Sequence, residues 1–160
     1  MARIRKTKIT GAKQLDNALK QLPKATSKNV LRRSLIKAAK PTAQFAETLA
    51  PRGASGSLVE SIEVGTKLAK SQQRGAVRYP VNVYVGPNMR EGFYAPYVEF
   101  GTEKATAQPF MRPAWIATRG RVLNLFGDEV WKALEKSART LARKAASGKL
   151  SKTARRTLTR

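Results

Sequence analysis

The side chains that most often perform chemistry in proteins are scarce in this sequence. Its 160 residues contain no histidine, no cysteine and only 10 aspartates and glutamates. A Ser-His-Asp triad, imidazole acid–base catalysis, a thiolate nucleophile and a Cys/His zinc site are therefore excluded. The acids are dispersed along the chain, whereas Mg²⁺-dependent nucleases cluster them around the metal. We therefore expect no enzyme activity, no metal site and no cofactor.

Two sequence features could be taken for functional motifs, one for a catalytic acid and one for a phosphate-binding loop. Glu99 is the one acid within an apolar, aromatic run, and an ion pair with Arg112 or an interface contact is favoured there over catalysis. A nuclease centred on Glu99 is the weakest alternative. The loop 53–57 resembles a phosphate loop only superficially, because it lacks the GxxxxGK[ST] spacing and follows a predicted helix. An ordinary turn is expected there.

Positive charge is concentrated at the two ends of the chain. The formal net charge of +22 divides into +11 for residues 1–40, +3 for 41–138 and +8 for 139–160. Cationic ends attract phosphates without reading bases, so sequence-independent nucleic-acid binding is one hypothesis. A solvated face, or docking on an acidic protein, is the other. The candidate contacts to DNA or to an acidic partner are Arg3, Arg5, Lys6, Lys149, Lys152, Arg155, Arg156 and Arg160.

The composition predicts a folded, soluble protein. Hydrophobic residues make up 41% of the chain, enough for a core. Residues 1–9 are charged but lack the apolar segment of a signal peptide. No stretch approaches the roughly 20 apolar residues that span a bilayer, so we expect no membrane contact.

Apolar periodicity predicts two helices in the first third of the chain. Residues 15–22 form an amphipathic pattern stopped by a proline. A long helix should begin near residues 26–27 and end at Ala50-Pro51, with a kink near Pro41 or two abutting helices meeting there. Its predicted apolar stripe comprises Leu31, Leu35, Ala38, Ala39, Phe45, Ala46 and Leu49.

The middle of the chain predicts a small antiparallel sheet. Residues 58–66 alternate loosely and 77–85 alternate clearly, with an exposed hairpin loop at 67–76 between them. Pro80 should occupy an edge position or a bulge, because it has no N–H for the ladder. Residues 86–88 are predicted to form a turn.

The remaining elements are predicted to be helical. The run 93–100 is ambiguous between strand and helix, but Pro96 in a first turn and Gly101 at the end favour helix. Residues 102–113 read as a loop or short strand. A long helix with a bend, weakened by two internal glycines, is predicted from Ala114 to about Ala146. The expected fold is α+β: a basic arm at 1–10, a single domain at 11–146 and a basic tail at 147–160.

A joint motif in the centre of the chain resembles a known family. Tyr94-Ala-Pro-Tyr-Val-Glu-Phe-Gly-Thr102, followed by Gln108-Pro-Phe-Met-Arg-Pro113, resembles the phage tail-component family of neck and tail-completion proteins of long-tailed phages. The order of the surrounding elements is similar as well, including Leu58-Val-Glu-Ser-Ile62, so the likeness covers residues 9–146. The loop before Leu58 is longer than the family's usual Arg-Thr-Gly-x-Leu, and the tail 149–160 lies beyond the family pattern.

The resemblance implies a non-enzymatic virion protein of the neck or tail, assembled in the host cytoplasm. It implies a ring at the head–tail junction, with a hexamer as one candidate stoichiometry, that joins or completes the tail. The implied partners are adjacent neck or head-closure proteins and tail-terminator or tail-tube proteins, with genomic DNA in the channel as a further contact. Large aromatic side chains beside prolines suit an interface, and they equally suit a cap on the core. The interface or motif candidates are Tyr94, Tyr97, Glu99, Phe100, Gln108, Phe110 and Arg112.

Overall fold

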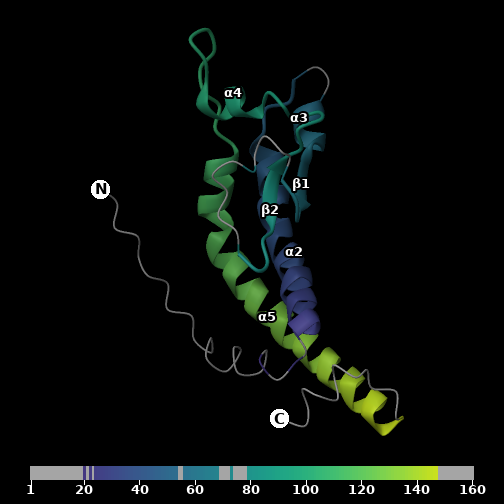
Figure 1. Cartoon of the computed structure of the whole chain (residues 1–160). Helices are drawn as coiled ribbons and strands as arrows, with labels where there is room; N and C mark the ends of the chain where they lie inside the picture. The colour runs from purple at the N-terminus through teal and green to yellow at the C-terminus, as the bar shows by residue number, and fades with distance from the viewer. Residues whose placement is uncertain are drawn as a thin grey trace.

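Two long helices form the axis of the fold (Figure 1). The computed structural model describes residues 20, 22, 24–53, 56–68, 73 and 79–147. Helix α2 spans Lys24–Leu49 and helix α5 spans Met111–Ala146. They run side by side, and the last turns of α5 extend past the start of α2. A two-stranded antiparallel sheet lies between the two helices in sequence. The combination of long helices and a small sheet confirms the predicted α+β class.

Several predicted segments lie outside the described residues. The basic arm at 1–10 and the tail beyond residue 147 are among them, as is most of the helix predicted at 15–22. Lys20 is helical and Leu22 is buried. All eight terminal cations predicted to contact DNA or an acidic partner fall in the undescribed parts.

Helix α2 is continuous through Pro41, so the alternative of two abutting helices is wrong. Every fourth residue from Val30 to Ala50 is buried, and most of these residues are small. Small side chains on this row let α2 lie close against α5. The predicted stripe is therefore partly wrong: Phe45 and Leu49 fall beside the row rather than on it, and both are exposed.

A buried pair of hydroxyl groups connects the two long helices. Thr42 Oγ1 and Thr118 Oγ1 lie 2.8 Å apart, and Thr118 Oγ1 also donates to the carbonyl of Ala114 at 2.7 Å. A hydroxyl has one hydrogen, so Thr42 is the donor between the helices and Thr118 the acceptor.

The sheet is shorter than predicted. Strand β1 spans Ile62–Gly65 and strand β2 spans Tyr84–Pro87, with Ile62 opposite Pro87 and Gly65 opposite Tyr84. Residues 58–60 belong to a helical turn, α3 (Ser57–Glu60), rather than to a strand. Gly56, at φ +65°, leads into that turn.

The clearest alternation in the sequence, residues 77–85, mostly does not form a strand. Residues 79–83 precede β2, and 77–78 lie outside the described residues, as does most of the predicted hairpin loop. Pro80 has no N–H, so a ladder cannot run through it without losing a bond. The predicted turn at 86–88 is also displaced, because Gly86 and Pro87 belong to β2. Asn88 Oδ1 accepts the backbone N–H groups of residues 90 and 91 and closes the turn there.

The helical interpretation of the aromatic run is confirmed by α4, which spans Ala95–Phe100. Pro96 lies in its first turn and Gly101 ends it at φ +77°. A Cβ at Gly101 would lie 2.9 Å from the backbone nitrogen of Ala107, so both the positive φ and the close approach require glycine. Residues 102–109 then form a projecting, exposed loop (Figure 1). Helix α5 begins at Met111, three residues earlier than predicted, and curves along its length (Figure 1).

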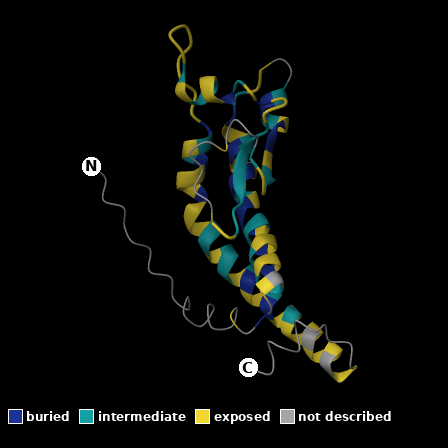
Figure 2. Ribbon diagram, in the orientation of Figure 1, coloured by how far each residue is buried: buried dark blue, intermediate teal, exposed yellow. Residues whose placement is uncertain are grey.

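Two apolar clusters lie along the helix pair, and Figure 2 shows the buried residues between the elements. One cluster surrounds Phe110 and includes Leu58, Ile62 and alanines of α2, α4 and α5. The other contains Leu22 and Val30, packed against Val130 and Leu134 of α5. The sheet, α3 and α4 therefore pack around the first cluster, whereas the second joins the two long helices and Leu22, which precedes α2.

We expect Thr118→Val to destabilise the fold by about 1–3 kcal/mol, because it leaves the buried Thr42 hydroxyl without its acceptor. Thr42→Val should cost less, since Thr118 keeps its bond to Ala114. The double substitution should cost less than the sum of the two. Urea unfolding measures all three.

The matched control is Thr140→Val, which removes the same bond to the carbonyl four residues earlier on an exposed face of α5. It should change the free energy of unfolding by less than about 0.5 kcal/mol. Equal costs at positions 118 and 140 would contradict a stabilising link between the helices.

Candidate functional site

The carboxylate of Glu99, on α4, accepts the first backbone N–H groups of α5. Glu99 Oε2 lies 2.8 Å from the nitrogen of Phe110 and 2.9 Å from that of Met111, and Oε1 lies 3.1 Å from that of Arg112. A helix begins with four N–H groups that have no partner inside the helix. The fourth position here is Pro113, which has no N–H. Glu99 therefore satisfies every unpaired donor at the start of α5.

These hydrogen bonds fix the protonation of Glu99. Burial alone would raise the pKa of this carboxyl, but the three backbone hydrogen bonds and the nearby Arg112 charge lower it below its ordinary value of 4.5. The group is therefore ionised at neutral pH, and its negative charge lies at the positive end of the α5 dipole.

The Glu99–Arg112 relationship differs from a simple ion pair. The carboxylate binds the backbone nitrogen of Arg112, while the guanidinium lies 6.0 Å from the centre of the Phe100 ring. This is a cation–π distance, and it places Arg112 and Phe100 together on the surface.

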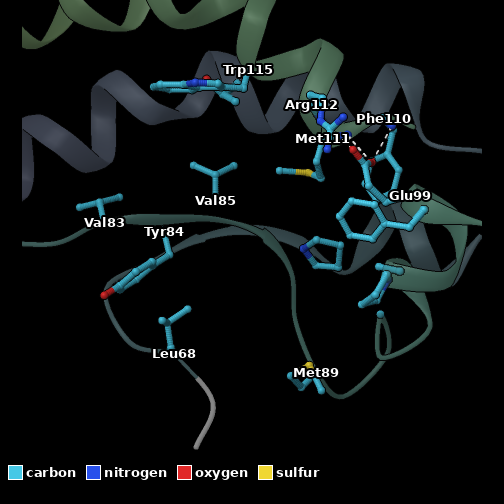
Figure 3. A pocket seen from close by; sticks show the side chains of 16 residues that line it. Leu68, Val83, Tyr84, Val85, Met89, Glu99, Phe110, Met111, Arg112 and Trp115 are labelled. Atoms are coloured by element: carbon cyan, nitrogen blue, oxygen red, sulfur yellow. Dashed lines mark hydrogen bonds between the residues drawn. The ribbon is translucent and has the colours of Figure 1, made fainter. Parts of the chain in front are cut away.

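An apolar groove of about 640 Å³ lies beside this helix start (Figure 3). Strand β2 forms one wall, α4 a second and the first turns of α5 a third. Figure 3 shows Val85 on β2 facing the side of α5 that carries Met111 and Trp115. The described lining residues are Thr42, Leu68, Val83, Tyr84, Val85, Pro87, Met89, Gly92, Ala95, Pro96, Glu99, Phe100, Phe110, Met111, Arg112 and Trp115.

Three large apolar side chains of this lining are exposed: Met89, Phe100 and Trp115, hereafter the groove rim. Phe100 is 69% exposed and Trp115 52%. An open apolar groove bordered by large exposed side chains is typical of a surface that another molecule covers. Tyr97 and Phe93 extend the exposed aromatic surface along and before α4.

The structure separates the candidates of the joint motif into two groups. Phe110 is fully buried, and Tyr94 packs on the same cluster with its hydroxyl 2.9 Å from Ser57 Oγ, so both belong to the core. Tyr97, Phe100, Gln108 and Arg112 are exposed. The backbone nitrogen of Gln108 donates to the carbonyl of Val98 at 2.8 Å and anchors the projecting loop to α4.

Sequence reasoning missed the contributions of Trp115 and Met89. Ala114 and Thr118 are the buried positions in this part of α5, whereas Trp115 is half exposed. A bulky residue one position off the row of small ones is the signal that could have identified it.

Nothing in the described part of the chain forms a metal site, since no three His, Cys, Asp or Glu side chains converge in it. None of the described helices is both long and apolar enough to cross a membrane. The groove can bind apolar groups, with Arg112 as the charge at its edge.

A protein-family model, "Bacteriophage HK97-gp10, putative tail-component", matches residues 13–101, more than half of the chain. The match includes α2, the sheet and α4 with Glu99, and it ends before the projecting loop and α5. Neither the curated proteins nor the solved structures gave a significant match.

We expect Glu99→Gln to destabilise the fold by about 1–2 kcal/mol at neutral pH, because an amide cannot accept three N–H bonds with a full charge. Since the pKa of Glu99 is lowered in the folded state, its contribution is present above pH 4.5 and is lost as the pH falls through the folded-state pKa. The difference between Glu99→Gln and the wild type should therefore shrink in acid. Urea unfolding across this pH range measures it.

Glu103→Gln, in the exposed loop after α4, is the matched control and should stay within about 0.5 kcal/mol of the wild type. A Glu99→Gln penalty that is constant with pH would show that the charge of the cap does not matter.

Proposed function

Because the chain belongs to the bacteriophage HK97-gp10-like family of tail components, we propose that it is a structural protein of the phage neck or tail that forms a ring at the head–tail junction and joins or completes the tail. A role in the virion implies contact with other phage structural proteins. The groove with its rim is the surface that we assign to that contact.

The single observation that carries this assignment is the exposure of Phe100 and Trp115 at the edge of an apolar groove. Leaving large apolar side chains in water is unfavourable by about 25 cal/mol per Å², and burial against a partner recovers that free energy. Aromatic side chains and arginine are also the residues that most often dominate binding at protein interfaces. Phe100 with Arg112 stacked near its ring supplies both.

The described surface supports a binding role rather than a catalytic one. The acid nearest the groove, Glu99, has its carboxylate committed to three backbone amides, so it is not available as a base or a metal ligand. With no histidine or cysteine in the chain, the proposed protein acts by assembly and needs no cofactor. Its neighbours would be head-closure or neck proteins on one side and tail-terminator or tail-tube proteins on the other.

Deleting the reading frame from the phage genome that carries it tests the proposed function. We expect electron micrographs of the resulting lysate to show separate heads and tails, or tails that lack their head-proximal end. Supplying the protein from a plasmid should restore joined particles. Infectious particles of normal appearance without the protein would refute the proposal.

Substitutions at the groove rim test the assigned surface. Phe100→Ala and Trp115→Ala should each weaken assembly by about 2 kcal/mol or more, which is about 30-fold in affinity. Plasmid complementation of the deleted phage, scored by titre and by the fraction of joined particles, measures the loss. Both side chains are largely exposed, so folding of the monomer should be retained.

Trp131→Ala is the matched control, because Trp131 is a similarly exposed tryptophan of α5 that does not line the groove. It should complement normally. If Trp131→Ala fails while both rim variants succeed, the contact surface lies elsewhere on the protein.

A further inference from the structure

The C-terminal half of α5 carries a row of cations that do not line the groove. Lys132, Lys136, Arg139 and Arg143 follow one another at steps of four, three and four residues, and all four are exposed. At 100° per residue these steps return to the same side of the helix. We call these four residues the cationic stripe.

The cationic stripe lies opposite the packed face of its helix. Val130 and Leu134 are buried against α2, half a turn away from the stripe. The four cations line a shallow hollow of about 420 Å³ together with Glu135 and Thr140. The last turns of α5, which carry the end of the stripe, extend past the start of α2 (Figure 1).

The acids near the stripe in the described part of the chain neutralise little of this charge. Lys132 lies 3.7 Å from Glu129, which is bound more closely by Lys37 at 2.7 Å, and Arg139 lies 3.9 Å from Glu135. The two ion pairs within the helix are long, and their cationic side chains are exposed to solvent. Ion pairs of this kind contribute little to stability. Glu135 is also the last acid of the sequence, and nine lysines and arginines follow it.

We propose that the cationic stripe binds the phosphate backbone of duplex DNA without reading its sequence. The stripe covers twelve residues of helix, and its first and last residues are about 16 Å apart along the axis. Four cations therefore face a backbone that carries one negative charge per about 1.7 Å of duplex axis. The site is separate from the groove, and it goes beyond the proposed assembly role.

The chemistry of the surface favours nucleic acid over an acidic protein. Protein interfaces have an apolar centre and are depleted of lysine, whereas DNA-binding surfaces are polar and strongly positive. Among the described residues, the exposed large apolar side chains of α5 end at Trp131, before the stripe. The stripe itself presents charged side chains and Thr140.

Binding of the full-length protein to a fluorescein-labelled duplex of unrelated sequence, followed by anisotropy over a salt series, tests the proposal. The wild type should bind with an affinity that falls steeply with salt. The variant K132Q/K136Q/R139Q/R143Q should reduce the slope of log affinity against log salt by about 3 to 4, since each lost phosphate contact accounts for about 0.9. Two duplexes of different sequence should behave alike.

The variant K24Q/K28Q/R32Q/R33Q is the matched control. It removes two lysines and two arginines that are exposed on α2, so its net charge equals that of the stripe variant. It should retain nearly the wild-type slope. Circular dichroism and thermal unfolding of both variants, with K136Q/R143Q as a milder substitution, show that any loss is not due to unfolding.

Three outcomes would overturn the proposal. Equal losses in the stripe and α2 variants would mean that net charge alone attracts DNA. An unchanged slope in the stripe variant would place the contacts elsewhere. Absence of DNA binding by the wild type, together with stripe-dependent binding of poly-glutamate, would identify the partner as an acidic protein instead.

Discussion

The fold around the groove depends on one partly buried interaction, in which the carboxylate of Glu99 caps the N-terminus of α5. A helix of 36 residues begins directly at the main apolar cluster, where unpaired N–H groups would be costly. Because Pro113 has no N–H, only three unpaired N–H groups remain at this helix start. The carboxylate of Glu99, eleven to thirteen residues earlier in the chain, accepts all three. Gly101 then allows the intervening loop to follow α4, because its positive φ and its close approach to the backbone of Ala107 both exclude a side chain with a Cβ. This explains physically why the two halves of the motif occur together: one half supplies the acceptor and the other the donors.

The same interaction determines which aromatic residues reach solvent. With α4 held against the start of α5, Phe110 points into the cluster, whereas Phe100 and Trp115 border the groove. Residues of similar type within one motif therefore have opposite roles. Phe110 contributes to stability by burial, and the rim residues remain available for a partner. The groove exists because β2, α4 and α5 meet around side chains that do not fill the space between them.

The two ends of the molecule differ in the side chains that they expose. Near the sheet, its exposed surface includes large apolar side chains with a single arginine at the groove edge. Along the C-terminal half of α5, the exposed surface carries lysines and arginines in a row. Apolar surface is covered most favourably by another protein, and a row of cations by phosphates. The two proposed partners, a structural protein at the groove and DNA at the stripe, would therefore bind at different ends of the molecule.

The sequence by itself determined the features that depend on local physics. Apolar periodicity located both long helices, Pro96 and Gly101 indicated α4, and the absence of histidine and cysteine excluded whole classes of chemistry. Tertiary structure decided the features that depend on which face is covered. Alternation at 79–83 did not become strand, because a strand needs a partner along its edge and Pro80 interrupts the ladder. Phe45 is exposed because α2 and α5 meet through small residues. Glu99 became a helix cap because folding brings the start of α5 to it, a contact that no spacing along the chain encodes.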